Sequence, residues 1–138
     1  MKIVTRYIED ELYVAENENG NTIQIDMRHS KDKRSLAPVE MMLASIAGCA
    51  AVDIVSMIKK KRKTVLDLKI ETYGTRKEDH PRALTHIKSK YTLYSPDTSL
   101  EAFEKVAKLA TDKYCSAAAS VKAEIEVECE VKPEKEHS

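Results

Sequence analysis

One segment, residues 38–57, limits what this chain can fold into more than any other feature. It begins with Pro38 and Glu40, which suit the first turn of a helix, and it is followed by five basic residues, 59–63, which suit the last turn. Between these ends the only polar side chains are Ser45, Asp53 and Ser56. A helix that is apolar nearly all round is typical of a buried central helix.

The chain of 138 residues is too short to surround such a helix alone, although its length suits a single domain, residues 1–138 with a polar tail at 133–138. We therefore predict a homodimer in which a second copy covers part of the helix. A membrane-spanning segment is the competing interpretation. Because Asp53 interrupts the span and about 20 apolar residues are normally needed, we expect no membrane partner.

Strand patterns fill most of the remaining sequence. Residues 2–27 hold three short runs rich in Ile, Val, Tyr and Thr, with turn-forming residues at 17–21, and they predict an antiparallel meander. Residues 65–76 and 82–94 predict two more strands, and strict alternation predicts a last, half-buried strand over 121–132. The pattern as a whole indicates an α+β fold.

A second helix is predicted after residue 97. Thr98 and Glu101 fit a capping box, in which a hydroxyl and a carboxylate three residues later cap the helix start. The residues that follow at helical spacing on one face are Leu100, Phe103, Val106, Ala107, Ala110 and Tyr114.

Composition excludes several classes of function. The 23 basic and 23 acidic residues give no net charge, which argues against a nucleic-acid partner. The three glycines, Gly20, Gly48 and Gly74, are too far apart for a phosphate-binding loop, and neither an HExxH nor a CxxC motif occurs, so we expect no nucleotide, metal or other cofactor. The N-terminus shows no secretory pattern, and we expect a cytoplasmic protein.

The three cysteines differ in their surroundings. Cys129 shares the parity of the apolar residues in the last strand, which favours core packing. Cys49 follows Gly48 inside the apolar helix, and a glycine there suggests close packing against something. Cys115 opens a run of small residues, 115–120, that fits the start of a short helical turn. Composition alone leaves open whether Cys49 and Cys115 react as a pair or are inert buried thiols.

The two stretches APVEMMLASIAGCAAVDIV (37–55) and DKYCSAAAS (112–120) resemble the family of osmotically inducible protein C and the organic hydroperoxide resistance proteins. The resemblance covers nearly the whole chain. It implies the fold of that family, in which antiparallel sheets wrap around a buried central helix, and an intertwined homodimer with a cysteine pair at each subunit interface. It also implies a role in oxidative-stress defence. By this resemblance Cys49 is the peroxidatic thiolate that attacks an organic hydroperoxide, Cys115 is the resolving thiol, and a dithiol reductant resets the site.

The activation of Cys49 is the least predictable part of the site. Cys49 lies about three turns past Pro38, beyond the reach of the helix dipole, so we expect a cation to lower its pKa. The family uses an arginine from the N-terminal strand region, and the candidates are Arg6, Arg28 and Arg34. Arg28 and Arg34 rank higher because they lie in the loop over 28–36 that precedes the cysteine helix.

The family steadies that arginine with a glutamate ten residues before the reactive cysteine. Val39 stands at this position, and Glu40, which follows, is the candidate for the role. A step of one residue turns the side chain by about 100° around the helix. These departures leave open a non-enzymatic dimer that binds a small apolar ligand, or a redox sensor.

Overall fold

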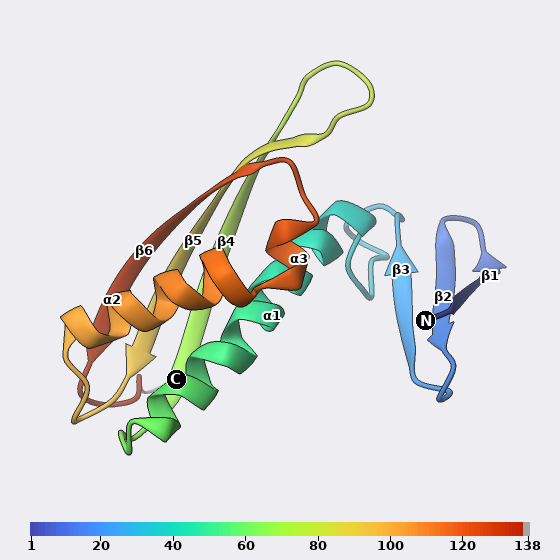
Figure 1. The fold of residues 1–138 in the computed structure, drawn as a ribbon. Helices are drawn as coiled ribbons and strands as arrows, with labels where there is room; N and C mark the ends of the chain where they lie inside the picture. The colour runs from blue at the N-terminus through green and yellow to red at the C-terminus, as the bar shows by residue number, and fades with distance from the viewer. Residues whose placement is uncertain (137–138) are drawn as a thin grey trace. The chain divides into compact units, whose positions relative to one another are not determined.

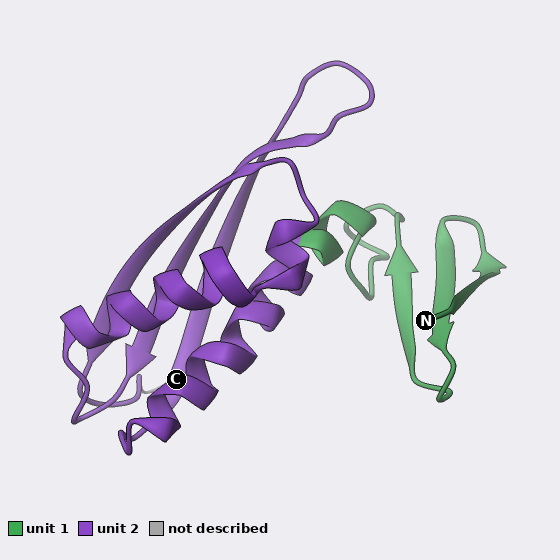
Figure 2. Ribbon diagram, in the orientation of Figure 1, with its two compact units in different colours: residues 1–42 green, residues 43–138 purple. Residues whose placement is uncertain are grey.

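The computed structural model describes residues 1–136, and the chain divides into two compact units (Figures 1 and 2). Unit 1 is Met1–Met42, and unit 2 begins at Leu43. The long helix α1, Pro38–Lys60, starts in the first unit and continues through the second. The single domain expected from chain length stays a prediction.

Unit 1 is the predicted meander. The strands β1 (Ile3–Glu9), β2 (Leu12–Asn17) and β3 (Thr22–Asp26) pair in sequence order, each antiparallel to the next. At the β2–β3 turn, Asn17 Oδ1 accepts the backbone N–H groups of Asn19 and Asn21, at 3.1 and 2.9 Å. These bonds satisfy the turn locally, which confirms the hairpin read from the Asn-rich segment.

Unit 2 is a three-stranded sheet covered on one face by helices (Figure 1). Its main core joins Ile54 of α1, Tyr91 of the central strand and Phe103 of the second helix, all fully buried. The remaining elements of this unit are β4 (Asp67–Arg76), β5 (Leu84–Tyr94), α2 (Leu100–Leu109), the π-helical turn η1 (Ala110–Tyr114), α3 (Ser116–Ala119) and β6 (Glu124–Lys132).

The prediction of antiparallel sheets is wrong for this second sheet. β4 and β5 are antiparallel, but β6 runs parallel to β5, with Ile87 opposite Ile125 and Leu93 opposite Val131. The reason is the connection, because α2, η1 and α3 carry the chain back along the sheet before β6 begins, as parallel strands require. Alternation along 121–132 set the faces of the last strand and carried no information about its direction.

Helix α1 is buried along one stripe within a single chain. Ile46, Ala50, Ile54 and Ile58 recur every four residues and face the core, whereas Val52 is 71% exposed. One chain therefore leaves part of the apolar helix uncovered, as expected from the length of the chain. The length and composition of α1 also meet those of a membrane-crossing helix, a test that core helices of soluble proteins pass too.

The start of α2 differs by one residue from the predicted capping box. Ser99 is the N-cap, and its side chain accepts the Ala102 N–H at 3.2 Å. Thr98 is buried instead and its hydroxyl accepts a hydrogen bond from Ser95. Leu100 and Tyr114, expected on the apolar face, are 46% and 50% exposed, because they lie at the ends of the buried stripe.

The polar tail expected at 133–138 lies partly outside the described residues, which end at 136. Within the described part, the Glu136 carboxylate pairs with Lys132 Nζ at 3.2 Å.

Candidate active site

Cys49 and Cys115 meet in unit 2, although they are far apart in the sequence. Cys49 lies midway along α1, and Cys115 follows η1 directly. Both belong to an apolar cluster with Ile46, Ile87 and Ala118. The Cys115 thiol donates to the Ile46 carbonyl at 3.7 Å, and the Cys49 and Cys115 thiols lie near enough to shift each other's pKa. All three cysteines of the chain are free thiols.

The surroundings of Cys49 favour its ionised form. The backbone N–H of Ala117 is the largest influence and lowers the pKa of the Cys49 thiol, with further lowering by the Cys115 thiol and the Ser116 N–H. Burial and the nearby Asp53 carboxylate both act against this effect, because each raises the pKa of the Cys49 thiol. The net direction is downward, so Cys49 is the more readily ionised of the two adjacent cysteines.

Cys115 has the opposite tendency. It is 3% exposed, and burial raises the pKa of its thiol. Its Sγ accepts the Ala118 N–H at 3.3 Å, which makes Cys115 the N-cap of α3. One sulfur therefore favours the thiolate while its neighbour keeps its proton, and this arrangement suits a nucleophile beside a second thiol that reacts later.

Backbone amides, which were not predicted from the sequence, lower the pKa of the Cys49 thiol. At Cys115 the chain is extended, with φ −77° and ψ 101°, and α3 begins at the next residue. The first N–H groups of a helix have no partner within it, so those of Ser116 and Ala117 are free to face a sulfur. The small side chains of this segment were the available clue, because they let its backbone approach α1 closely.

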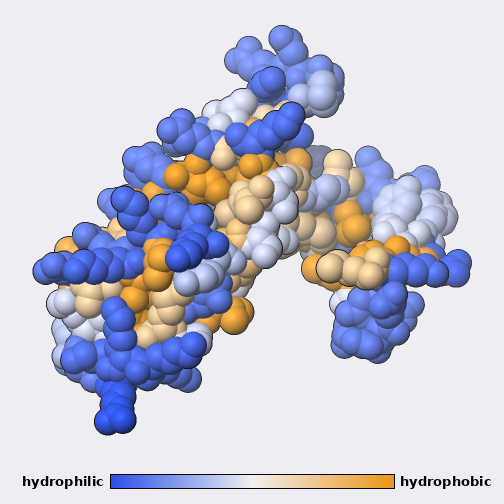
Figure 3. Space-filling view, in the orientation of Figure 1, coloured by the Kyte–Doolittle hydropathy of each residue, from blue (hydrophilic) through white to orange (hydrophobic). Residues whose placement is uncertain are grey.

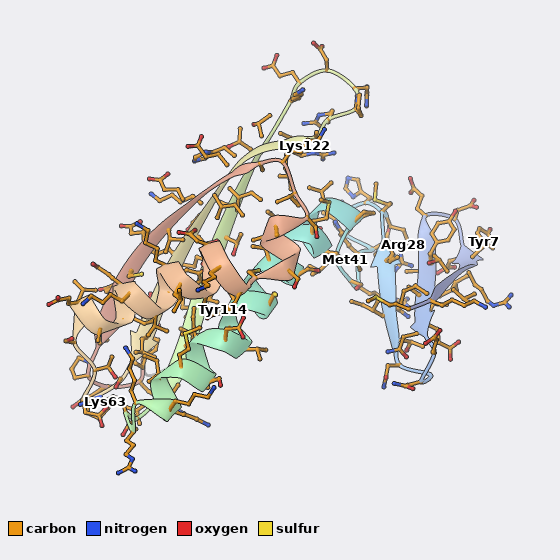
Figure 4. All side chains as sticks on the ribbon, in the orientation of Figure 1. Tyr7, Arg28, Met41, Lys63, Tyr114 and Lys122 are labelled. Atoms are coloured by element: carbon orange, nitrogen blue, oxygen red, sulfur yellow. The ribbon has the colours of Figure 1, made fainter. Side chains whose placement is uncertain are left out.

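Arg28 lies in unit 1 (Figure 4). Two carboxylates hold its side chain there. Its Nε and Nη2 donate to the two oxygens of Asp26, at 3.0 and 2.7 Å, and its Nη1 donates to Glu9 at 3.0 Å. Asp26 is fully buried, and its hydrogen bonds with Arg28 hold its pKa well below the usual range. The guanidinium therefore organises the loop that follows β3.

Arg34 and Glu40 also have partners within unit 1. The backbone N–H of Arg34 donates to Asp26 Oδ2 at 2.8 Å. Glu40 Oε1 accepts from Lys33 Nζ at 2.8 Å and from the Ala37 N–H at 2.9 Å, and the Lys33 contact lowers the pKa of Glu40. Glu40 thus caps the start of α1. The roles proposed for Arg28, Arg34 and Glu40 toward Cys49 stay predictions.

Cys129 packs in the main core from β6, as its parity predicted. Burial raises the pKa of its thiol to about 11. No group of three or more His, Cys, Asp or Glu side chains within residues 1–136 comes close enough to hold a metal ion.

The fold and the site together define a class of small α+β proteins in which a long helix and a helical crossover bring two cysteines into contact. The chain belongs to the OsmC-like protein family, whose pattern matches residues 30–130.

Two similar proteins align over most of their length. Protein YhfA of Escherichia coli strain K12 is 32% identical over 118 residues, which cover 86% of this chain and 87% of YhfA. The crystal structure of a hypothetical protein from Aquifex aeolicus VF5 has 31% identity and a TM-score of 0.83, with 95% of each chain covered.

A third similarity concerns the fold alone. The organic hydroperoxide resistance protein OhrB of Bacillus subtilis has 15% identity and a TM-score of 0.60, with 95% of this chain and 96% of OhrB covered.

Proposed function

We propose that this protein is a thiol-dependent peroxidase that reduces organic hydroperoxides. The observation that carries the proposal is the contact between Cys49 and Cys115 together with the opposite directions of their pKa shifts. A peroxidatic cysteine must be a thiolate at neutral pH, and its partner must lie within reach to form a disulfide.

The reaction runs in three steps. The Cys49 thiolate attacks the terminal oxygen of the hydroperoxide, the O–O bond breaks, and the alkoxide takes up the proton that Cys49 had released, giving an alcohol and a Cys49 sulfenic acid. The Cys115 sulfur then attacks the sulfenic sulfur, and the hydroxyl leaves with the Cys115 proton as water. A cytoplasmic dithiol, itself oxidised to a disulfide, returns both cysteines to thiols.

We further propose that the active protein is a homodimer. Apolar side chains reach the surface on each unit (Figure 3). In unit 1, Tyr7 is 62% and Ile23 52% exposed, and in unit 2, Val52 on α1 is 71% exposed. A three-stranded meander with an apolar face and a helix with an uncovered apolar side both gain stability from a second copy.

Thiol counting after addition of one equivalent of cumene hydroperoxide tests the peroxidase proposal. We expect two thiols to be lost within seconds and peptide mass spectrometry to find Cys49 joined to Cys115. Cys49→Ser should abolish peroxide consumption, Cys115→Ser should leave a sulfenic acid on Cys49, and Cys129→Ser is the matched control that should behave as wild type. Unchanged turnover by Cys49→Ser would refute the assignment.

A second candidate is a non-enzymatic dimer that binds a small apolar ligand or acts as a redox sensor. Asp53 favours it, because a carboxylate beside Cys49 raises the pKa of the thiol and slows its reaction. This candidate predicts that Cys49 reacts with iodoacetamide at the rate of an ordinary buried thiol. A redox sensor would form the disulfide without sustained turnover.

A further inference from the structure

Behind Cys115 lies a pair of buried hydroxyl groups that the proposed reaction does not use. Tyr91 Oη on β5 and Thr111 Oγ1 on η1 are 2.8 Å apart. The Tyr91 residue is fully buried and Thr111 is 5% exposed, so water does not compete for this contact. Thr111 lies four residues before Cys115, on the segment that carries the resolving thiol, whereas Tyr91 lies on β5.

The direction of the hydrogen bonds follows from the number of protons. The Thr111 hydroxyl donates to the Ala107 carbonyl at 2.9 Å, and a hydroxyl has one proton to give. Tyr91 must therefore donate to Thr111 Oγ1. The result is a chain of two bonds from the central strand through Thr111 to the last turn of α2, which fastens the start of η1 to the sheet.

The turn η1 determines where Cys115 points. A π-helical turn contains one residue more than the same stretch of α-helix, and such turns are frequent at functional sites. If Ala110–Tyr114 relaxed to an α-helix, every later residue would rotate by about 100° around the helix axis. The Cys115 sulfur would then leave the Cys49 sulfur and the Ile46 carbonyl.

The pKa of Tyr91 favours its protonated form. Burial raises the pKa of the Tyr91 phenol, and a negative charge on Cys115 raises it further. The phenol therefore stays protonated while Cys115 reacts, and its donor bond to Thr111 persists through the reaction.

We propose that Tyr91 and Thr111 are positioning residues that hold η1 in the conformation from which Cys115 closes the disulfide. The proposal rests on the proposed peroxidase function and adds to it that the hydroxyl pair acts on the second step alone. Attack of Cys49 on the hydroperoxide needs neither hydroxyl, whereas attack of Cys115 on the sulfenic acid depends on the aim of its sulfur.

The test uses the full-length variants Tyr91→Phe and Thr111→Val, each of which removes a hydroxyl while keeping its size. Tyr94→Phe makes the same change on the same strand, three residues away, and is the matched control. Rapid quench-flow mixing with cumene hydroperoxide gives the rate of Cys49 oxidation and the rate of disulfide formation separately. Thr111→Ser keeps the hydroxyl and removes only the methyl group, and it therefore tests whether the hydroxyl alone is sufficient.

We expect disulfide formation to slow roughly fivefold or more in Tyr91→Phe and Thr111→Val, as for loss of one buried hydrogen bond, with Cys49 oxidation unchanged. Overoxidised Cys49 should then accumulate, and Thr111→Ser should recover the wild-type rate. Equal disulfide rates in wild type and both variants would overturn the proposal, as would equal slowing of both steps, which indicates a general loss of structure.

A second oxidant separates this proposal from the peroxidase function. Diamide couples two neighbouring thiols without a hydroperoxide and is itself reduced to the hydrazine. Wild type could fail to react with cumene hydroperoxide while the two variants form the disulfide with diamide more slowly than wild type does. In that case the peroxidase function fails and the positioning role stands. If diamide acts equally fast on all variants, the positioning role fails.

Discussion

Replacing Gly48 with alanine tests whether a second copy covers α1. Within one chain, a Cβ at this position would meet nothing within 4 Å. Alanine is favoured over glycine inside a helix by about 0.5–1 kcal/mol, so an isolated chain should become more stable by that amount. For a chain of this size, the gain corresponds to a rise in Tm of roughly 3 °C. The proposed homodimer predicts the opposite, because the added methyl group would enter the helix interface.

The assay is thermal unfolding at 1 and 100 µM protein, together with size-exclusion chromatography at both concentrations. We expect the Gly48→Ala variant to have a lower Tm than wild type and to dissociate at the lower concentration, since the stability of a dimer depends on protein concentration. A Tm about 3 °C above wild type at both concentrations would refute an interface at this face of α1.

Three further predictions concern single residues. Asp26→Asn should lower the Tm at pH 7. Because folding lowers the pKa of Asp26 below its usual 3.8, the difference in Tm from wild type should shrink as the pH falls below that value. A difference in Tm that stays constant with pH would contradict this. Gly74→Ala should cost about 1 kcal/mol in urea unfolding, since the new Cβ would lie 2.8 Å from Leu84 Cδ2; an unchanged midpoint would contradict it. Cys129, whose burial raises its pKa to about 11, should be alkylated last at pH 7, and early modification would contradict the assigned packing.

The elements that were predicted well are those whose patterns are local. Alternating residues located β6, and the Pro38 start and basic end located α1. The direction of β6 was not predictable in this way, because the same alternation serves a parallel or an antiparallel neighbour. The uncovered side of α1 was predictable, because its apolar residues are spread nearly all round the helix in a chain too short to surround it.

In the candidate site, too, some features were predictable from the sequence and others were not. The contact between Cys49 and Cys115 was suggested by family resemblance and not by spacing. The amides of Ser116 and Ala117 were missed because backbone groups leave no trace in residue identity. The charge of Arg28 made it a candidate for activating Cys49. The partner of its guanidinium in the structure is Asp26, an acidic residue two positions earlier in the sequence.

The crossover that makes β6 parallel has a consequence for the proposed disulfide. Cys115 lies within that crossover and Cys49 lies on α1, so a disulfide between them would enclose β4, β5 and α2 in one covalent loop. Closing a loop of that length restricts the unfolded chain by about 4 kcal/mol. The oxidised protein would thus resist unfolding more than the reduced protein.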